Sequence, residues 1–248
     1  MNTPKDNFSS QSNLYARYRP KYPAQLYSFL NSLLITKDLA WDCATGNGQV
    51  AKELAAFFEK VYANDISLQQ IGNAVKKENI FYSIERAEHT SFPDNYFDLI
   101  TVAQAIHWFD FDLFYKEVIR TIKPHGIFAV IGYGQLKVEP DIDAVIKHFY
   151  TITIGSFWDK ERKYIDENYQ TIPFPFNEIK APALNNQFEW TLEELLGYFE
   201  TWSAVQHFIK ANGSNPVELV KTELKKIWQK GSTKKIQFPV LLRVAQIN

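Results

Sequence analysis

Residues 39–55, LAWDCATGNGQVAKELA, constrain the fold of this chain more than any other stretch. An apolar segment runs into an acid, then into a loop with two glycines one residue apart, and then into an amphipathic helix. Within residues 42–48 the glycines let the backbone turn tightly and come close to a ligand. The helix, beginning near Asn47, points its free N–H groups over the loop. This strand–loop–helix unit predicts a site for a nucleotide-like ligand.

Two cofactors compete for that loop. Gly46, Gly48 and Ala51 match the dinucleotide fingerprint, and Asp65 follows at about 20 residues, where a ribose-binding acid is expected. Asp42 argues against a dinucleotide, because its carboxylate would lie beside the negatively charged pyrophosphate. Two like charges at ~4 Å repel by roughly 1 kcal/mol in water and by more in a dry pocket. S-adenosylmethionine carries a sulfonium and an ammonium and no phosphate, so the same acid attracts it. We therefore favour S-adenosylmethionine, with S-adenosylhomocysteine as product, and keep an NAD-dependent oxidoreductase as the alternative.

The composition excludes several other classes of protein. The chain has 248 residues, 46% of them hydrophobic, and a net charge of −1, so no global field recruits nucleic acid or an anionic membrane. The one cysteine, Cys43, excludes an internal disulfide framework and a cysteine-rich zinc site, and we expect no metal. We find neither a signal peptide nor an apolar run long enough to span a membrane, and therefore expect a cytoplasmic protein.

Strand and helix patterns alternate from residue 37 to residue 133, which predicts an α/β protein with a doubly wound parallel sheet. The expected strands cover residues 39–43, 61–65, 79–84, 97–103, 126–133, 184–190 and 236–244. The expected helices cover residues 24–34, 47–58, 68–75, 111–119, 142–152, 191–202 and 217–230. Residues 156–182 show no clear period. Pro239 predicts a bulge or an edge in the last strand.

Ligands in such sheets gather beyond the carboxyl ends of the strands, where several candidate residues fall. Asp65 ends the second strand and can accept both ribose hydroxyls. Glu88, or the backbone beside it, can accept from an adenine amine. The segment from Gln104 through His107 follows the fourth strand and should lie beside the reactive methyl group.

An arm rich in tyrosine and arginine precedes the first helix. Tyr15 or Tyr18 could face the sulfonium by cation–π attraction, and Arg19 could pair with a carboxylate. The alternative is an arm that only packs its rings on the domain.

Together these motifs resemble the class I S-adenosylmethionine-dependent methyltransferases, within them the type 11 group that includes trans-aconitate methyltransferase. The resemblance rests on residues 18–23, 42–48, 65–67, 87–88, 92–98, 103–109 and 122–126. It covers residues 14–135 well and the remainder more weakly. The chain departs from the family at Ala44 and His125, where glycines are usual.

The resemblance implies a Rossmann-like fold with a seven-stranded sheet whose last strand is antiparallel. Residues 1–36 would form an arm and a helix, residues 37–135 the cofactor-binding core, and residues 136–248 the rest, with a helical cap at about 191–232. The cofactor-binding residues would be Asp42, Ala44, Gly46, Gly48, Asp65, Ile66, Ala87, Glu88, Ala103, Gln104, Tyr18 and Arg19.

The expected reaction is in-line methyl transfer to a small-molecule acceptor. A carboxylate acceptor needs no base, whereas a phenol, amine or thiol does, and His107 is the best-placed imidazole. Trp108, Trp158 and Trp202 could line the acceptor pocket or belong to the core. A tRNA or rRNA methyltransferase and a non-catalytic cofactor sensor remain as alternatives. We expect a monomer or a homodimer and no membrane partner.

Overall fold

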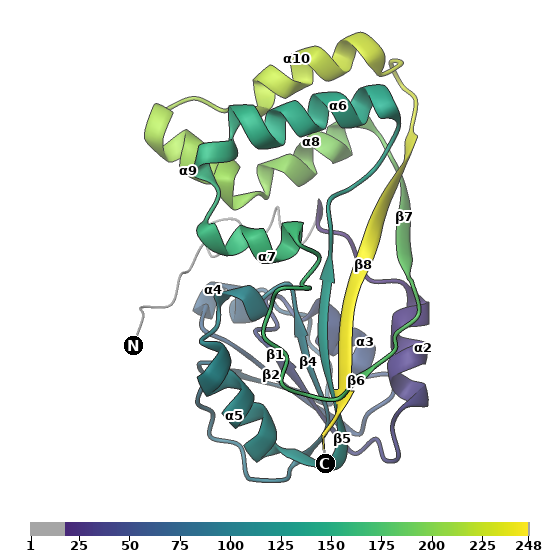
Figure 1. The fold of residues 1–248 in the computed structure, drawn as a ribbon, viewed down its shortest axis with the longest axis vertical. Coiled ribbons are helices and arrows are strands. Elements are labelled where there is room, and N and C mark those ends of the chain that lie inside the picture. The colour runs from purple at the N-terminus through teal and green to yellow at the C-terminus, as the bar shows by residue number, and fades with distance from the viewer. Residues whose placement is uncertain (1–17, 248) are drawn as a thin grey trace.

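The computed structural model describes residues 18–247, which form a twisted sheet carrying a helical cap (Figure 1). The strand order is β3-β2-β1-β4-β5-β8-β6. β7 lies outside this order and pairs with the first half of β8, residues 234–239. The strands are β1 (Leu39–Cys43), β2 (Lys60–Asp65), β3 (Ile80–Ile84), β4 (Phe97–Ala103), β5 (Ile122–Tyr133), β6 (Glu178–Ile179), β7 (Asn185–Trp190) and β8 (Lys234–Gln246). β1 to β5 are parallel and β8 runs antiparallel to β5, which confirms the Rossmann-like fold class.

The described sheet has eight strands where we expected seven. The reason is that β8 is longer than its pairing with β5. Its C-terminal end also pairs with β6, and its N-terminal half pairs with β7. Pro239 stands at the change of partner: pairing with β5 reaches Val240, and pairing with β7 starts at Pro239. A proline lacks the N–H group that a continuous ladder requires, so the expected irregularity falls at this position.

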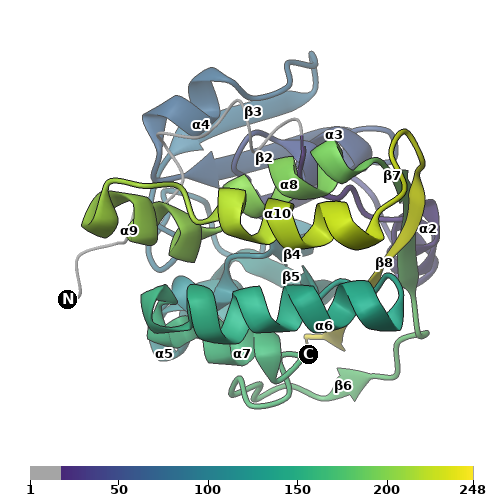
Figure 2. The same cartoon turned by 90° about the horizontal axis from the view of Figure 1, so that it is seen from above.

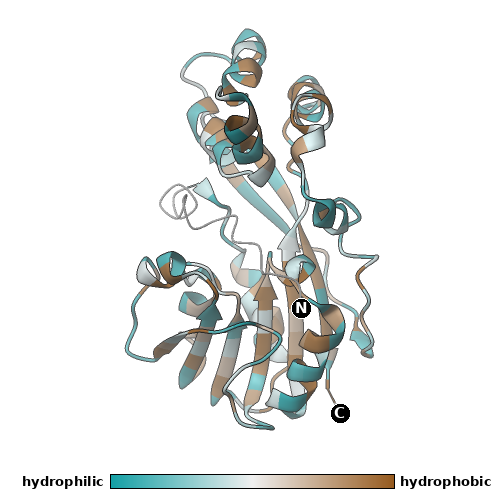
Figure 3. Cartoon of the chain, turned by 90° about the vertical axis from the view of Figure 1, so that its left-hand side faces the viewer, coloured by the Kyte–Doolittle hydropathy of each residue, from teal (hydrophilic) through white to brown (hydrophobic). Residues whose placement is uncertain are grey.

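Side chains alternate between the two faces of the sheet, and helices cover both faces. Ala40 faces α2 (Ala24–Ser32) and α3 (Gln49–Leu54), whereas its neighbour Trp41 faces α5 (Phe111–Thr121). This two-residue period is what a strand buried on both sides requires. Figure 3 shows the hydrophobic residues concentrated along the central strands. Within residues 18–247 every helix is too short or too polar to cross a membrane.

Four helices stand over the sheet as a cap (Figures 1 and 2). They are α6 (Pro140–His148), α8 (Leu192–Glu200), α9 (Ser203–Asn212) and α10 (Val217–Ile227), and they share one hydrophobic cluster. The predicted capping box at Thr191 and Glu194 is present at the start of α8. The structure adds α6 to the cap, because Ile142 and Ile146 pack in the same cluster as Leu195.

Several boundaries differ from the sequence expectation. α3 and α4 (Leu68–Gly72) are each shorter than predicted. β5 starts at Ile122 rather than at Gly126, because the expected turn is an irregularity inside the strand, with His125 in the left-handed region at φ 66°. The aperiodic stretch 156–182 contains only short elements, among them a 3-10 turn (Lys160–Arg162) and α7 (Lys163–Asp166).

Candidate functional site

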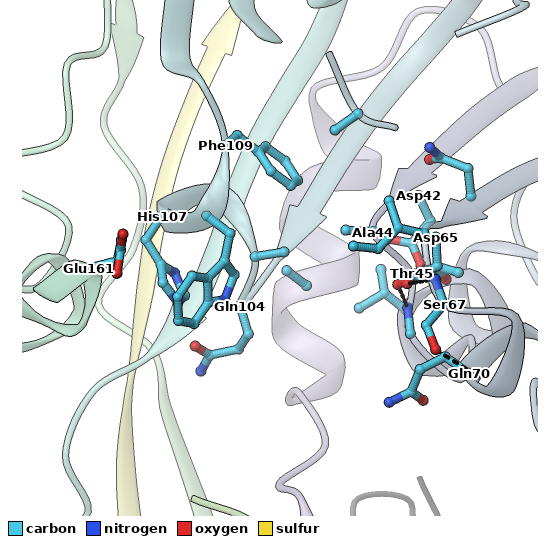
Figure 4. Close-up of a pocket in the computed structure, with 18 of the residues that line it drawn as sticks. Asp42, Ala44, Thr45, Asp65, Ser67, Gln70, Gln104, His107, Phe109 and Glu161 are labelled. Atoms are coloured by element: carbon cyan, nitrogen blue, oxygen red, sulfur yellow. Dashed lines mark hydrogen bonds between the residues drawn. The ribbon is translucent and has the colours of Figure 1, made fainter. Parts of the chain in front are cut away.

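A cavity of about 1040 Å³ lies beyond the carboxyl ends of the parallel strands. It is lined by the loops after β1, β2, β3 and β4, by Arg19 and Tyr133, and by residues 160–164 excluding Arg162. Figure 4 shows two groups of side chains, with Asp42 and Asp65 at one end and His107 and Glu161 at the other. Ligand pockets typically measure about 300–1,000 Å³, so this cavity is at the upper end of that range.

Gly46 and Gly48 are needed in the loop for different reasons. Gly46 lines the cavity at φ 58°, and a Cβ on it would meet only the Gln70 Oε1 atom, at 4.0 Å. Gly48 is absent from the cavity wall, and a Cβ on it would come within 2.3 Å of the Tyr82 hydroxyl oxygen. Gly46 therefore keeps space open on the ligand side, whereas Gly48 makes room for a tyrosine of β3. Ala44 also takes a left-handed conformation, at φ 50°, without being a glycine.

Replacing Gly48 by alanine should lower the free energy of unfolding by about 3 kcal/mol, because it adds a steric clash to left-handed strain. Urea denaturation measures the loss. Gly213→Ala is the matched control, since Gly213 has φ 68° and open space around its Cα, and it should cost only about 1 kcal/mol. Equal losses in the two variants would show that Tyr82 is not the reason for the glycine.

Asp42 is buried beneath the loop that it was expected to guard. Its Oδ1 accepts from the Thr101 hydroxyl (2.9 Å), and its Oδ2 accepts from the Ala51 N–H (3.0 Å) and the Thr45 hydroxyl (2.5 Å). The side chain touches the cavity wall, although the residue is only 1% exposed. Burial raises the pKa of Asp42 to about 6, against the opposing effect of these hydrogen bonds. The carboxylate thus shapes the loop directly, through hydrogen bonds to Thr45 and to the N–H group of Ala51.

Asp65 ends β2 and faces the cavity. Its Oδ2 accepts from the Gly46 N–H and its Oδ1 from the Ser67 N–H, both at 2.9 Å. These two bonds hold the carboxylate at the cavity wall. Ile66, next to it, is 40% exposed and offers an apolar surface to a base. Asp65 and Ile66 both line the cavity.

Ala87 and Glu88 also line the cavity. Glu88 Oε2 accepts from Arg86 Nε and its Oε1 from the Asp110 N–H, each at 3.3 Å. These bonds join the loop after β3 to the start of α5. They hold the Glu88 side chain at the cavity wall.

Residues 103–109, at the end of β4 and directly after it, contribute a wall of the cavity. Ala103 and Gln104 lie at the strand end, and Gln104 takes φ 56° while its side-chain amide donates to the Tyr133 carbonyl oxygen (3.3 Å). His107 is buried, with Nδ1 3.3 Å from the Tyr169 hydroxyl oxygen. Burial, with Arg162 and Arg19 nearby, lowers the pKa of His107 to about 3. The imidazole is therefore neutral at physiological pH.

The arm residues divide between the cavity and the cap. Arg19 lines the cavity and donates to the Tyr133 hydroxyl oxygen (2.8 Å) and to the Thr201 carbonyl oxygen (2.9 Å). Tyr18, expected at the sulfonium, instead packs its ring against Gly197 of α8, where a Cβ would come within 2.6 Å of it. The reason is that Gly197 leaves a gap in the cap that the ring fills. Tyr15 lies outside the described residues.

Arg162 is the residue that sequence reasoning missed. With Trp158 and Trp202 it lines a smaller cavity of about 30 Å³ that adjoins the main one at Arg19, Gln104, His107 and Trp108. All three expected tryptophans thus reach a cavity. Residues 160–163, KERK, form a run of charges inside the aperiodic stretch, and that run was the available signal. Residues 18–247 hold no cluster of metal-ligating side chains.

Comparison with known proteins agrees with this geometry. Residues 41–130 match the family model described as a methyltransferase domain. A Dictyostelium discoideum protein named as a candidate methyltransferase is 36% identical over 245 residues, covering 96% of this chain and 93% of the relative. The chain belongs to the class I S-adenosylmethionine-dependent methyltransferases. Membership of this family removes the dinucleotide alternative.

Two further matches extend over most of this methyltransferase. A solved structure from Anaeromyxobacter dehalogenans, described as a type II methyltransferase, superposes with a TM-score of 0.85 at 34% identity and covers 92% of this chain and 98% of its own. A Saccharomyces cerevisiae protein, named as an S-adenosylmethionine-dependent methyltransferase, is 22% identical and covers 89% of each chain. The cap as well as the core therefore has counterparts in related proteins.

Proposed function

We propose that this enzyme transfers the methyl group of S-adenosylmethionine to a small-molecule acceptor held beneath the cap. The supporting observation is the division of the main cavity into two chemically different ends. Asp42, Asp65 and Glu88 gather at the loop end, which suits a cationic donor with ribose hydroxyls. His107 and Trp108 lie at the end that adjoins the smaller cavity, which Trp202 and Ser203 of the cap also line.

S-adenosylmethionine supplies a methyl carbon already activated by its sulfonium. The protein has to align that carbon with the acceptor atom, and alignment can be worth about 7–11 kcal/mol of the barrier. A neutral His107 whose pKa is near 3 is a weak proton acceptor, which opposes the general-base role considered from the sequence. We therefore propose that His107 contacts the acceptor as a neutral hydrogen-bonding group, and that the methylated atom needs no base, as in a carboxylate.

Replacing His107 by glutamine should lower kcat by less than about tenfold and leave the pH dependence of kcat between pH 6 and 8 unchanged. General bases contribute about 10²–10⁴-fold and produce a titration near their own pKa, so both readouts separate the two roles. A wild-type rate profile that rises near pH 6.5, and a variant without that rise, would restore His107 as the base.

A nucleic-acid substrate lacks support in the surface charge. Lys221 and Lys226 on α10 are each paired with a glutamate three residues earlier, Lys234 is paired with Glu139, and the chain has a net charge of −1, which weakens the field available to a phosphate backbone. A gel-shift assay with bulk RNA tests this point directly. Tight, salt-sensitive binding would favour a tRNA or rRNA methyltransferase over the small-molecule enzyme.

The acceptor can be found by incubating the enzyme with fractionated metabolite extract and S-adenosylmethionine carrying an isotopically labelled methyl group. We expect one labelled small molecule, identified by mass, and none with Asp65→Ala. Lack of turnover despite cofactor binding would favour a non-catalytic sensor.

A further inference from the structure

The small cavity of about 30 Å³ concentrates hydrogen-bond donors on the cap side of His107. Its wall includes Arg19, Arg162, Trp202 and Ser203. It shares His107 and Trp108 with the main cavity but contains no residue of the loop after β1 or of the end of β2. A group held there is thus separated from the cofactor end by the wall that follows β4.

Arg162 is positioned by its surroundings and has donors to spare. Its Nε donates to the Tyr150 hydroxyl oxygen (2.7 Å) and lies 3.6 Å from Asp166 Oδ1. Its guanidinium stacks over the Trp158 ring at 4.5 Å and the Tyr150 ring at 5.4 Å. Within residues 18–247, neither terminal guanidinium nitrogen donates a hydrogen bond, although the side chain is only 17% exposed. A guanidinium that packs on two aromatic rings with both terminal N–H groups available is suited to bidentate binding of an anion.

Other groups on the same wall add to the positive potential. Trp202 is buried, and in the part of the chain that the structure describes its indole N–H has no acceptor. Ser203 begins α9, which no side chain caps, so the helix end contributes partial positive charge. Arg19 brings a second guanidinium, and Asp159 is the one acid among the residues lining this cavity. Asp159 and Asp166 offset part of this charge, so the donors on this wall are the terminal N–H groups of Arg162 and the Trp202 indole N–H.

We infer that the small cavity binds an anionic group of the methyl acceptor, a carboxylate or a phosphate, which is not the group that becomes methylated. Its volume suits one such group and no larger one, because a single water requires about 10–15 Å³ by the same kind of measure. Arg162 would be the specificity-determining residue, with Tyr150 and Trp158 positioning it. The two arginines that lower the pKa of His107 would be partly neutralised by such an anion, so binding should raise that pKa. This inference rests on the proposed function.

The test uses the full chain saturated with S-adenosylhomocysteine and three probes: succinate, inorganic phosphate and uncharged succinamide. Calorimetry gives the affinities, and the Trp202 indole N–H signal in ¹H–¹⁵N spectra reports the location. We expect succinate or phosphate, and not succinamide, to bind and shift that signal. The preferred anion distinguishes a carboxylate subsite from a phosphate subsite. If neither anion binds at concentrations up to about 20 mM, or if succinamide binds equally well, the inference is wrong.

Two variants make the test independent of folding. Arg162→Gln should weaken anion binding at least about tenfold. Ser203→Asp places a negative charge in the cavity at a helix N-terminus, where acids are tolerated, and should abolish binding in a folded protein. Lys234→Gln removes a cation from elsewhere and should bind normally. Unchanged affinity in Ser203→Asp would overturn the subsite.

The affinity of each variant for S-adenosylhomocysteine is measured separately. If the wild-type protein does not bind S-adenosylhomocysteine, the proposed function is wrong. Normal cofactor binding without anion binding would contradict the subsite alone.

Discussion

Replacing Asp65 by alanine is expected to weaken the binding of S-adenosylmethionine and S-adenosylhomocysteine by at least about 100-fold. Each hydrogen bond from a ribose hydroxyl to a charged acceptor contributes about 1.5–3 kcal/mol, and two are lost. The variant also releases the Gly46 and Ser67 N–H groups that shape the loop. Isothermal titration calorimetry measures the affinities. Asp65→Asn keeps one acceptor oxygen and should show a smaller loss.

Asp94→Ala is the control for the Asp65 variant. Asp94 is an exposed acid paired with Arg120, at the far end of β4 from the cavity, so its removal changes net charge equally. We expect cofactor affinity within about twofold of wild type and a similar melting temperature. If Asp65→Ala binds the cofactor as well as Asp94→Ala does, the ribose assignment is wrong.

Asp42 should make the ligand-free protein less stable above pH 6 than an asparagine variant. The folded state raises the pKa of Asp42 from 3.8 to about 6, so it holds a proton more tightly than the unfolded chain does. The charged form therefore costs stability: about 3 kcal/mol at pH 7, with most of the decrease between pH 6 and pH 4, where about 0.6 kcal/mol remains. Asp42→Asn removes this cost, and the stability difference from wild type should follow that curve.

Denaturant unfolding of both proteins across pH 4 to 8 measures the curve. The difference between the two proteins matters, because Asp98 and Glu117 have lowered pKa values and lose their stabilising effect at still lower pH in both. A stability difference that does not change across this range would show that Asp42 does not titrate near pH 6.

The same variant should lose cofactor affinity while gaining stability. A bound sulfonium and ammonium favour the charged carboxylate, so binding lowers the pKa of Asp42 and releases a proton near pH 6. The affinity for S-adenosylmethionine should therefore rise from pH 5 to pH 7 in the wild type. S-adenosylhomocysteine, without the sulfonium, should show a weaker rise, and Asp42→Asn almost none. Calorimetry in buffers of different ionisation enthalpy detects the proton.

The sequence alone determined the parts of this enzyme that depend on local pattern. Apolar runs with an acid at their ends located β1 and β2, and the two glycines placed a loop between β1 and α3. The capping box at Thr191 located the start of α8. These features were readable because strand period, helix capping and turn chemistry act over a few neighbouring residues.

The tertiary structure decided what each of those residues experiences. Gly48 packs against Tyr82, and Asp42 is buried beneath the loop. Tyr18 packs against the cap, although the sequence suggested that it would face the cofactor. The tertiary structure also buried His107 and brought Arg162, from a stretch without period, close to it, and burial first, then the nearby arginines, lower the pKa of the histidine. Burial and charge depend on segments that lie far apart in the chain, so no local pattern could report them.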